Sequence, residues 1–481
     1  MTILLEPSHL NLQEIIVSVP KGNLQNENAL HIERKDIKSL YATAPLNLSE
    51  AIRSIPGVET TTTGTGIGKP IIRGLSGNRI VTYAQGMRIE NQQWGDEHGL
   101  GIGDVGIESV EVIKGPASLL YGSDALGGVL YFVDERFAKQ NHISGFAGTS
   151  FHSNTLGSIN NFGLKLNKNK LKWNLFGSYG SHADYQTPNK QRVYNTRFDE
   201  KYLKTSFGYS NKHWISKLGY SYLNNNFGIT EEDSIYSTST ERSSALPFQT
   251  IDNHNVSWEN TLFPKKSKLS LIAGYTSNRR KEFEESPDTA ALDMNLQTYT
   301  YNTKWYAPTI RDKIDIIIGS QGMFQSNTNN GEELLIPDAT TTDIGAFGLI
   351  NLSLNKLNFL TGVRWDHRSI SSNEYYEDSE PLFEATNKRF TSVNYSAGGV
   401  YALTKMVARI NISSGFRAPN TSELLSNGVH EGTNQYVIGN TGLSSENATQ
   451  VDLSFDYSGE HLNFSINPFY NRVNNYIYLS P

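Results

Sequence analysis

The sequence predicts an all-β dominated chain whose long C-terminal part has the pattern of a transmembrane antiparallel β-barrel. Beyond about residue 140, short segments of alternating apolar and polar residues are separated by breaks rich in Gly and Asn. Aromatic residues make up 11% of the 481 residues. No apolar run approaches the roughly 18 residues that a membrane helix needs. Composition alone favours a soluble all-β protein, since the mean hydropathy is −0.44.

Composition also narrows the function. The chain has no cysteine, which excludes disulfides and thiolate metal sites. Its net charge is −6, and Lys and Arg are dispersed, so no nucleic-acid partner is expected. Residues 1–10 lack a basic region and a cleavage motif, so Met1 is interpreted as an internal start rather than the start of a signal peptide.

Residues 107–133 carry the most specific local pattern. Alternating apolar residues lead into Lys114-Gly115-Pro116, a short apolar segment follows, and glycines at 122, 127 and 128 precede a second apolar run. Glycine permits positive φ, and Pro116 prevents a helix from continuing into this segment. The pattern predicts a strand, a tight turn, one helical turn, a glycine kink and a second strand.

Two further motifs lie upstream. Residues 46–57 have apolar side chains at helical spacing, with Ser49 as a possible cap and Pro56-Gly57 as the stop. Residues 72–80 read IRGLSGNRI.

In this combination and order, residues 46–133 resemble the plug domain of TonB-dependent outer-membrane receptors. Gln85-Gly86 stands where that family usually has Asp-Gly, and Tyr131 stands where Asn is common. The resemblance implies a monomeric protein of the Gram-negative outer membrane. Its α+β plug (21–138) would sit inside a β-barrel (139–481) that has 22 strands in this family.

Residues 1–20 resemble the tail of a small β domain that precedes some plugs, followed by a TonB box. A TonB box is an extended peptide that pairs with a strand of the energy-transducing protein TonB, which is β-augmentation. An ordinary edge strand is the alternative interpretation. The residues assigned to this partner contact are Leu12, Glu14, Ile15, Ile16, Val17, Ser18 and Val19.

The predicted barrel is short for this family. Alternating segments occur at 173–180, 269–275, 314–318, 357–365 and 462–467, and long polar stretches at 230–244 and 371–388 are expected to be extracellular loops. About 340 residues at roughly 20–25 per strand give about 14 to 16 strands. We therefore expect a barrel that lacks several C-terminal strands, and unpaired edges in lipid are unfavourable.

A metal site is predicted in the loop between the two plug motifs. Asp96, Glu97 and His98 bring carboxylate and imidazole donors together, which suits a borderline ion such as Zn²⁺. The run 428–433, which contains His430, resembles a barrel loop of the zinc-uptake subgroup. That resemblance implies metal capture by Glu97, His98 and His430, with Asp96 nearby. A solvated polar turn is the alternative for residues 96–98.

These patterns favour a TonB-powered receptor that imports a scarce ligand, most simply a divalent metal such as zinc or a metal chelate. A ferric-siderophore or haem receptor of the same fold is the alternative within transport. A passive porin or adhesin barrel is the alternative of another class. Hydrolase chemistry finds no supporting set of residues, so no catalytic residue and no cofactor is assigned. Zinc would be cargo, and the expected partners are outer-membrane lipid, TonB and the ligand.

Overall fold

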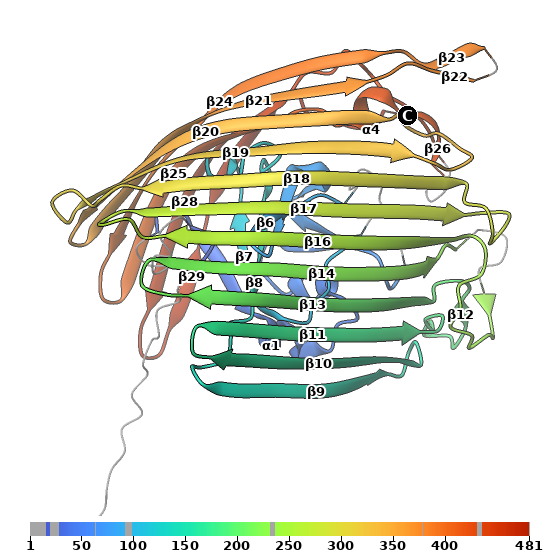
Figure 1. The fold of residues 1–481 in the computed structure, drawn as a ribbon, viewed down its shortest axis with the longest axis horizontal. Coiled ribbons are helices and arrows are strands. Elements are labelled where there is room, and N and C mark those ends of the chain that lie inside the picture. Colours follow the sequence, from blue (N-terminus) through green and yellow to red (C-terminus); the bar gives the residue numbers. More distant parts are fainter. Residues whose placement is uncertain are drawn as a thin grey trace, which may run out of the picture.

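A small N-terminal domain lies within the curve of one large antiparallel sheet (Figure 1). The computed structural model describes residues 16–19, 28–62, 64–91, 99–230, 236–377, 379–430 and 435–480. In these residues no helix combines the length and the apolar character needed to cross a membrane. The arrangement confirms the predicted α+β plug and all-β dominated fold.

The plug is built on a five-stranded sheet of order β1-β7-β8-β5-β6, in which only β5 and β8 pair in parallel. A three-stranded sheet, β2-β3-β4, lies beside it. The plug elements are β1 (Ile32–Asp36), α1 (Ile37–Leu40), α2 (Leu48–Ile52), β2 (Val58–Thr62), β3 (Gly68–Ile72), β4 (Leu75–Ser76), β5 (Ile80–Ala84), β6 (Met87–Ile89), β7 (Ile107–Lys114), α3 (Ser118–Tyr121) and β8 (Gly128–Asp134), with single 3-10 turns at Tyr41–Thr43 and Gly77–Arg79.

The structure confirms the predicted order of elements in residues 107–133. Strand β7, the one-turn helix α3 and strand β8 follow one another, with Gly115 and Gly122 at positive φ between them. Gly115 also permits a close approach, because a Cβ on it would lie 2.0 Å from Nε2 of Gln450 in the large sheet. This turn therefore brings plug backbone directly against the barrel wall.

The helix predicted at 46–57 is shorter than expected and has a different cap. Helix α2 covers Leu48–Ile52, and the side chain of Asn47 accepts a hydrogen bond from the amide of Glu50 at 2.9 Å. The predicted cap, Ser49, is instead buried and donates to the carbonyl of Gly68 at 2.8 Å. The cap assignment to Ser49 was wrong, because that hydroxyl joins α2 to β3.

The large sheet has 16 strands, in agreement with the number estimated from chain length. Its order is β9-β10-β11-β13-β14-β16-β17-β18-β19-β20-β21-β24-β25-β28-β29, and β30 also pairs with β28. Among the described strands, β9 and β29 do not pair with each other, so the barrel is open. The first eight strands are β9 (His142–His152), β10 (Gly157–Lys168), β11 (Leu171–His182), β13 (Phe198–Ser210), β14 (Trp214–Gly228), β16 (Phe248–Leu262), β17 (Lys268–Phe283) and β18 (Leu292–Tyr306).

The remaining strands of the large sheet follow in chain order, and short strands and the helix α4 lie in the connections between barrel strands. The barrel strands are β19 (Ile314–Asn329), β20 (Ala339–Leu354), β21 (Leu357–Ser372), β24 (Thr386–Ala402), β25 (Met406–Arg417), β28 (Glu446–Ser458), β29 (Asn463–Ile466) and β30 (Phe469–Asn474). The connecting elements are β12 (Arg192–Val193), β15 (Tyr236–Ser237), β22 (Tyr375–Glu377), β23 (Glu380–Phe383), α4 (Thr421–Leu425), β26 (Asn427–His430) and β27 (Gln435–Ile438).

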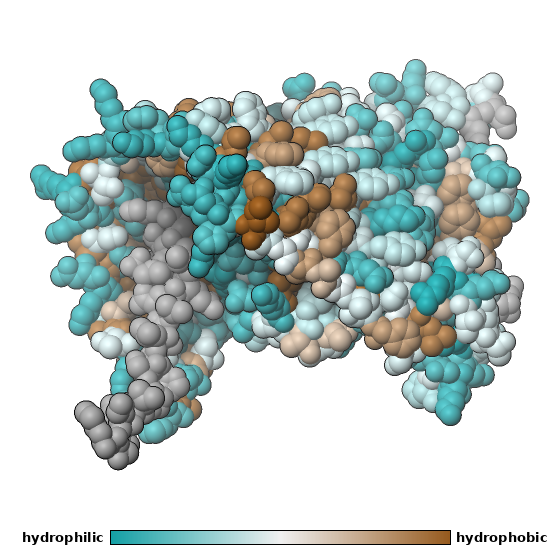
Figure 2. All heavy atoms as spheres, turned by 60° about the horizontal axis from the view of Figure 1, so that its bottom comes forward, coloured by the Kyte–Doolittle hydropathy of each residue, from teal (hydrophilic) through white to brown (hydrophobic). Residues whose placement is uncertain are grey.

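The barrel strands are polar inside and apolar outside. On β21, Val363 and Trp365 are 54% and 44% exposed, whereas Arg364 and Asp366 between and beside them are 3% and 5% exposed. This is the alternation of a strand with one face toward lipid and one toward a polar lumen. Figure 2 shows one side of the molecule, on which hydrophobic patches lie near the middle and toward the right-hand end, among hydrophilic residues.

The connections distinguish the two ends of the barrel. At one end, on the left in Figure 1, the turns are short, for example the two residues between β20 and β21. At the other end the connections are long, including 229–247, 373–385 and 418–445. Long connections are extracellular in transmembrane barrels, so this end is assigned to the outside. The stretches 230–244 and 371–388, predicted as extracellular loops, belong to this end, although β21 and β24 extend into the second of them.

Candidate functional site

A cavity lies between the plug and the barrel wall on the side of the long connections. Its plug wall is formed by β5, β6 and the loop after α3, and its barrel wall by strands β18 to β21 with the start of the 418–445 connection. Apolar Leu296 and Met323 share the lining with polar Arg88, Asp124 and Arg368. An apolar cleft with a few convergent polar groups is the usual form of a ligand site.

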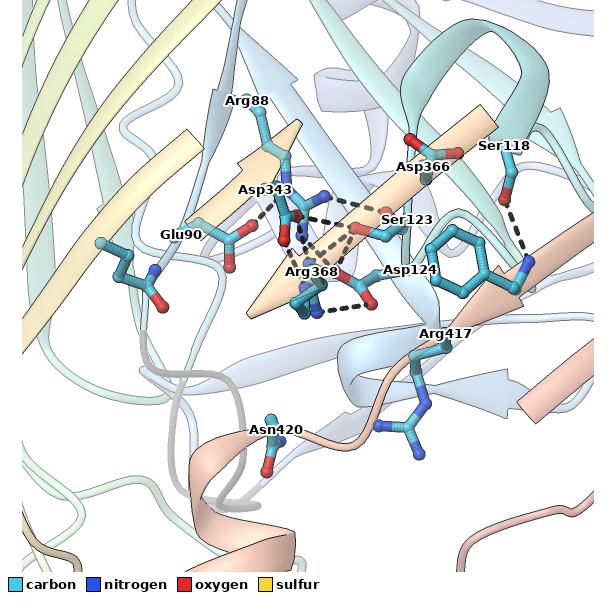
Figure 3. A network of polar contacts seen from close by, with 12 residues as sticks. Arg88, Glu90, Ser118, Ser123, Asp124, Asp343, Asp366, Arg368, Arg417 and Asn420 are labelled. Carbon is cyan, nitrogen blue, oxygen red and sulfur yellow. Dashed lines mark hydrogen bonds and ion pairs between the residues drawn. The ribbon is translucent and has the colours of Figure 1, made fainter. Parts of the chain in front are cut away.

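Two arginines and two aspartates hold the plug to the wall of this cavity (Figure 3). Arg368 of β21 donates to Asp124 of the plug at 2.7 and 3.1 Å, and to Asp343 of β20 through two bonds of 2.6 Å. Arg88 of β6 reaches the same Asp124 at 2.6 Å. Ser123 accepts from Arg368 at 2.6 Å and donates to Asp343 at 3.0 Å. We call these five residues the arginine cluster.

The charges of the plug residues follow from this geometry. Burial alone would raise the pKa of Asp124, but the guanidiniums of Arg368 and Arg88 outweigh it and hold that pKa below its ordinary value. Burial raises the pKa of Glu90, and the neighbouring Arg88 offsets this only in part. The plug wall of this cavity therefore carries one carboxyl whose pKa is lowered, that of Asp124, and one whose pKa is raised, that of Glu90.

A second ionic network joins the IRGLSGNRI segment to the barrel. Arg79 donates to Glu446 at the start of β28 through bonds of 3.0 and 2.6 Å. Arg417 at the end of β25 donates to the same Glu446 at 2.8 Å and to Glu423 at 2.7 and 2.9 Å. Glu423 is also the third residue of α4, where it completes a capping box with Asn420.

Another cavity at the same end has an aromatic wall. His182, Phe198 and Phe227 line it, and the rings of His182 and Phe198 stack with centroids 4.4 Å apart. Aromatic faces of this kind suit a planar ligand.

Most of the predicted metal-binding residues lie outside the described residues. Asp96, Glu97 and His98 belong to 92–98, and His430 is described only as the last residue of β26, on the long 418–445 connection. No group of three or more His, Cys, Asp or Glu that could hold a metal occurs in the described part of the chain.

The described residues on either side of 92–98 are bonded to each other and to the barrel. Asn91 donates to the carbonyl of Leu100 at 2.8 Å, and Asn253 of β16 donates to Asn91 at 3.2 Å and to the carbonyl of Gly101 at 2.9 Å. The chain therefore leaves and re-enters the described plug at one anchored point.

The last four residues of the TonB-box-like segment, Ile16–Val19, are among the residues that the structure describes. Leu12, Glu14 and Ile15 lie outside the described residues, whereas Ile16, Ser18 and Val19 are buried and Val17 is 43% exposed. They share a cavity with Lys268 at the start of β17 and Tyr306 at the end of β18. Both residues adjoin short connections, so this segment lies at the end opposite the arginine cluster.

Sequence reasoning missed the arginine cluster. A signal for it exists in β21, where Arg364, Asp366 and Arg368 occupy the lumen face between apolar residues. Charged residues on the inner face of a barrel strand must find partners inside, and Asp124 within the plug motif is such a partner.

Comparisons with known proteins agree with this architecture. The family model for the TonB-dependent receptor plug domain matches residues 26–129, and the model for the TonB-dependent receptor-like beta-barrel matches residues 135–481. The heme/hemopexin utilization protein C of Haemophilus influenzae is 24% identical over 485 residues, which cover 88% of this chain. The match spans 66% of the length of that relative.

Solved structures share the fold at low identity. The hemophore receptor HasR of Serratia marcescens, in complex with its hemophore HasA and heme, has a TM-score of 0.77 and 14% identity, covering 94% of this chain and 74% of that chain. The ferric yersiniabactin uptake receptor FyuA of Yersinia pestis has a TM-score of 0.71 and 13% identity, covering 93% and 72%. These relatives are described as haem and siderophore receptors, so the zinc-uptake subgroup expected from the sequence is not supported.

Proposed function

We propose that this chain, which belongs to the family of TonB-dependent receptors, captures haem or a related ferric chelate and imports it across the outer membrane. The observation that best supports this choice of cargo is the similarity to the heme/hemopexin utilization protein over 88% of the chain. It favours the haem or siderophore alternative over the zinc cargo that the sequence first suggested.

The described cavities support this choice. Both lie between plug and barrel on the side of the long connections, where a ligand arriving from outside would first meet the plug. One has an aromatic wall and the other carries Arg88 and Arg368. Aromatic rings can stack on a planar ligand and arginines can pair with carboxylates, so each cavity offers one kind of contact that a chelate such as haem can make.

We further propose that His98 and His430 contact the cargo iron. A neutral imidazole is a common axial ligand of haem. His430 belongs to the connection whose beginning lines the cavity of the arginine cluster, and His98 belongs to the segment anchored at Asn91 and Asn253. The same two side chains would bind zinc if zinc were the cargo. Titration with haem and with Zn²⁺ therefore decides between the two cargoes.

Replacing His98 or His430 by Ala is expected to weaken haem binding at least about tenfold and to change the haem absorption spectrum, because an axial ligand is removed. The measurement is titration of the receptor with haem, followed by absorption spectroscopy. His213→Ala is the matched control, since His213 is exposed at a short connection on the opposite end. Unchanged haem affinity in both variants, with tight Zn²⁺ binding that both abolish, would return the assignment to zinc.

Deletion of residues 12–19 separates active transport from passive passage. We expect the deletion to abolish uptake while haem still binds, because residues 16–19 lie at the end away from the cargo cavities and the segment would serve for capture by TonB. Uptake by cells and haem titration of isolated receptor are measured in parallel. Undiminished uptake would instead identify a passive porin.

A further inference from the structure

A cavity at the short-connection end of the barrel carries two lysines. Lys268 begins β17 and Lys304 lies near the end of β18, and both line the cavity between plug and wall. Its volume is about 310 Å³, against about 70 Å³ for each of the two cavities at the opposite end. Ligand pockets usually have volumes of about 300–1,000 Å³, so this cavity is large enough to be one. We call it the lysine cavity.

Lys304 has no counter-ion in the part of the chain that the structure describes. Its side chain makes no hydrogen bond or ion pair with a described residue, and the charged side chains close to it, Lys268 and Arg364, are both cations. Arg364 is already bonded to Asp366 at 2.7 Å. No Asp or Glu is among the described residues that line the cavity. An inward-facing ammonium without an anion is costly, so a negative charge in the lysine cavity is stabilised.

The strand register places the second lysine beside the first. Lys268 pairs with Tyr306, and Ser270 pairs with Lys304, so the two lysines lie on neighbouring rungs of one strand pair. Nζ of Lys268 lies 3.6 Å from the centre of the Tyr306 ring, a cation–π contact that orients this side chain along the inner face of β18. Two positive charges are therefore held on one patch of the barrel wall.

The plug side of the lysine cavity includes three tyrosine rings. Tyr83 of β5 and Tyr131 of β8 stack with their planes 11° apart, and Tyr121 of α3 meets Tyr83 edge-on with ring centroids 5.0 Å apart. The hydroxyls of Tyr83 and Tyr131 make no hydrogen bond with a residue that the structure describes. Aromatic rings suit a planar ligand, and hydroxyl donors suit a carboxylate.

A smaller cavity lies between the lysine cavity and the arginine cluster. It has a volume of about 50 Å³ and shares Arg88 and Met323 with the cavity of the cluster. It shares Tyr83, Tyr121 and Asn302 with the lysine cavity. The three cavities therefore follow one another along the inner face of β17 to β21, from the side of the long connections to the side of the short ones.

The two ends of this series differ in what they offer an anion. At the cluster, Arg88 and Arg368 are both bonded to Asp124, so a carboxylate that arrives there competes with a resident one. At Lys304 the described residues supply no resident carboxylate. A carboxylate in the lysine cavity thus gains an ion pair without breaking one.

We propose that the lysine cavity is a second binding site, on the periplasmic side, for a planar aromatic ligand that bears carboxylates. Lys304 and Lys268 pair with the carboxylates, and the rings of Tyr83 and Tyr131 contact the planar part. Haem belongs to this chemical class, so the identification of the ligand with the cargo rests on the proposed function. The site then holds the cargo after it has left the arginine cluster.

The chain has no cysteine, so Ser270→Cys provides a single thiol on the wall of the lysine cavity, opposite Lys304 in strand register. The rate at which a small methanethiosulfonate reagent modifies this thiol is measured on the isolated full chain in detergent, with metal-free protoporphyrin as the probe. We expect protoporphyrin to slow modification at least about tenfold, and its dimethyl ester, which lacks the charges, to change the rate less than about twofold. Equal protection by acid and ester would overturn pairing with the lysines.

Substitution of Lys304 tests the residue itself. In the Ser270→Cys background, Lys304→Gln is expected to raise the protoporphyrin concentration for half-protection about tenfold, and Lys304→Arg should retain most of the protection. Lys313→Gln is the matched control, because Lys313 is exposed on the connection between β18 and β19 at the same end. Half-protection at the parental concentration in Lys304→Gln would overturn the site.

The unfolding midpoint separates binding from a structural role. Lys304→Gln should unfold at or above the parental temperature, because a charge without a counter-ion does not stabilise the fold. A lower midpoint would show that Lys304 holds the barrel or plug together and would overturn its assignment to the ligand.

Haem absorption distinguishes failure of this site from failure of the proposed function. Haem that binds, while neither haem nor protoporphyrin protects the thiol, would overturn the site and leave the proposed function standing. Protection by protoporphyrin in a receptor that does not bind haem would support the site and overturn haem as the cargo. Haem that binds and protects the thiol in the parent, but does not protect it in Lys304→Gln, is the result expected if both are right.

Discussion

Arg368→Ala is expected to destabilise the docking of the plug against the barrel by about 3–5 kcal/mol. The Arg368 side chain is 6% exposed and bonds to Asp124 and Asp343, whose side chains are 8% and 15% exposed. Removing the guanidinium leaves Asp124 bonded to Arg88 but takes from Asp343 its two bonds of 2.6 Å, in a largely water-free site. Breaking a buried ion pair from one side costs more than the pair contributes, because the remaining charge keeps its desolvation penalty.

The measurement is the midpoint of plug unfolding in detergent, together with the rate of proteolysis within residues 107–133. Arg368→Lys separates charge from geometry, since an ammonium cannot make the paired bonds to both aspartates. The unfolding midpoint of Arg368→Lys should fall between those of the parent and Arg368→Ala. Arg389→Ala is the matched control, because Arg389 is exposed on the neighbouring strand β24. An Arg368→Ala protein with the parental midpoint would show that the cluster does not hold the plug.

Glu446→Ala is expected to cost about 3 kcal/mol, with the loss concentrated on the IRGLSGNRI segment. The Glu446 side chain is fully buried and accepts from Arg79, from Arg417 and from the amide of Ile477 at 2.6 Å. Arg417 keeps its two bonds to Glu423, whereas Arg79 loses both of its bonds to Glu446. Arg73 remains bonded to Asp452 at 2.8 Å, so the segment should loosen without leaving the barrel.

Hydrogen exchange of the amides of residues 72–80 measures this loosening. Glu446→Gln retains an acceptor and should show a smaller effect than Glu446→Ala. Glu460→Gln is the control, because Glu460 is 81% exposed on the turn between β28 and β29 and forms an ion pair with Lys405, whose side chain is 56% exposed. Faster exchange across the whole plug, rather than in this segment, would argue that Glu446 stabilises the domain globally.

Local patterns were sufficient where one short stretch of chain determines its own conformation. The strand, helical turn and strand of 107–133 depend on glycines that permit positive φ and on one proline, and all of these are visible in sequence. The inward and outward faces of β21 follow from a side-chain period of two. The number of barrel strands follows from length, because each strand and connection uses a similar number of residues.

Departures from the family pattern became intelligible only in three dimensions. Gln85 occupies a left-handed turn position with φ 53°, and its buried side chain accepts from Ser257 of β16 at 3.3 Å. Tyr131 stacks on Tyr83 with ring centroids 5.7 Å apart. In both cases the side chain is used for a contact between strands or domains, which no local pattern encodes.

The sequence by itself determined the family, the plug and the alternating strands, since each depends on residues close together in the chain, whereas the TonB box at residues 12–19 stays a prediction. The tertiary structure alone decided which charges meet. Arg368 and Asp124 are 244 residues apart, and Arg79 and Glu446 are 367 apart. Such pairs arise only when the sheet curves around the plug, because burial then forces every inward charge to find a partner across the interface.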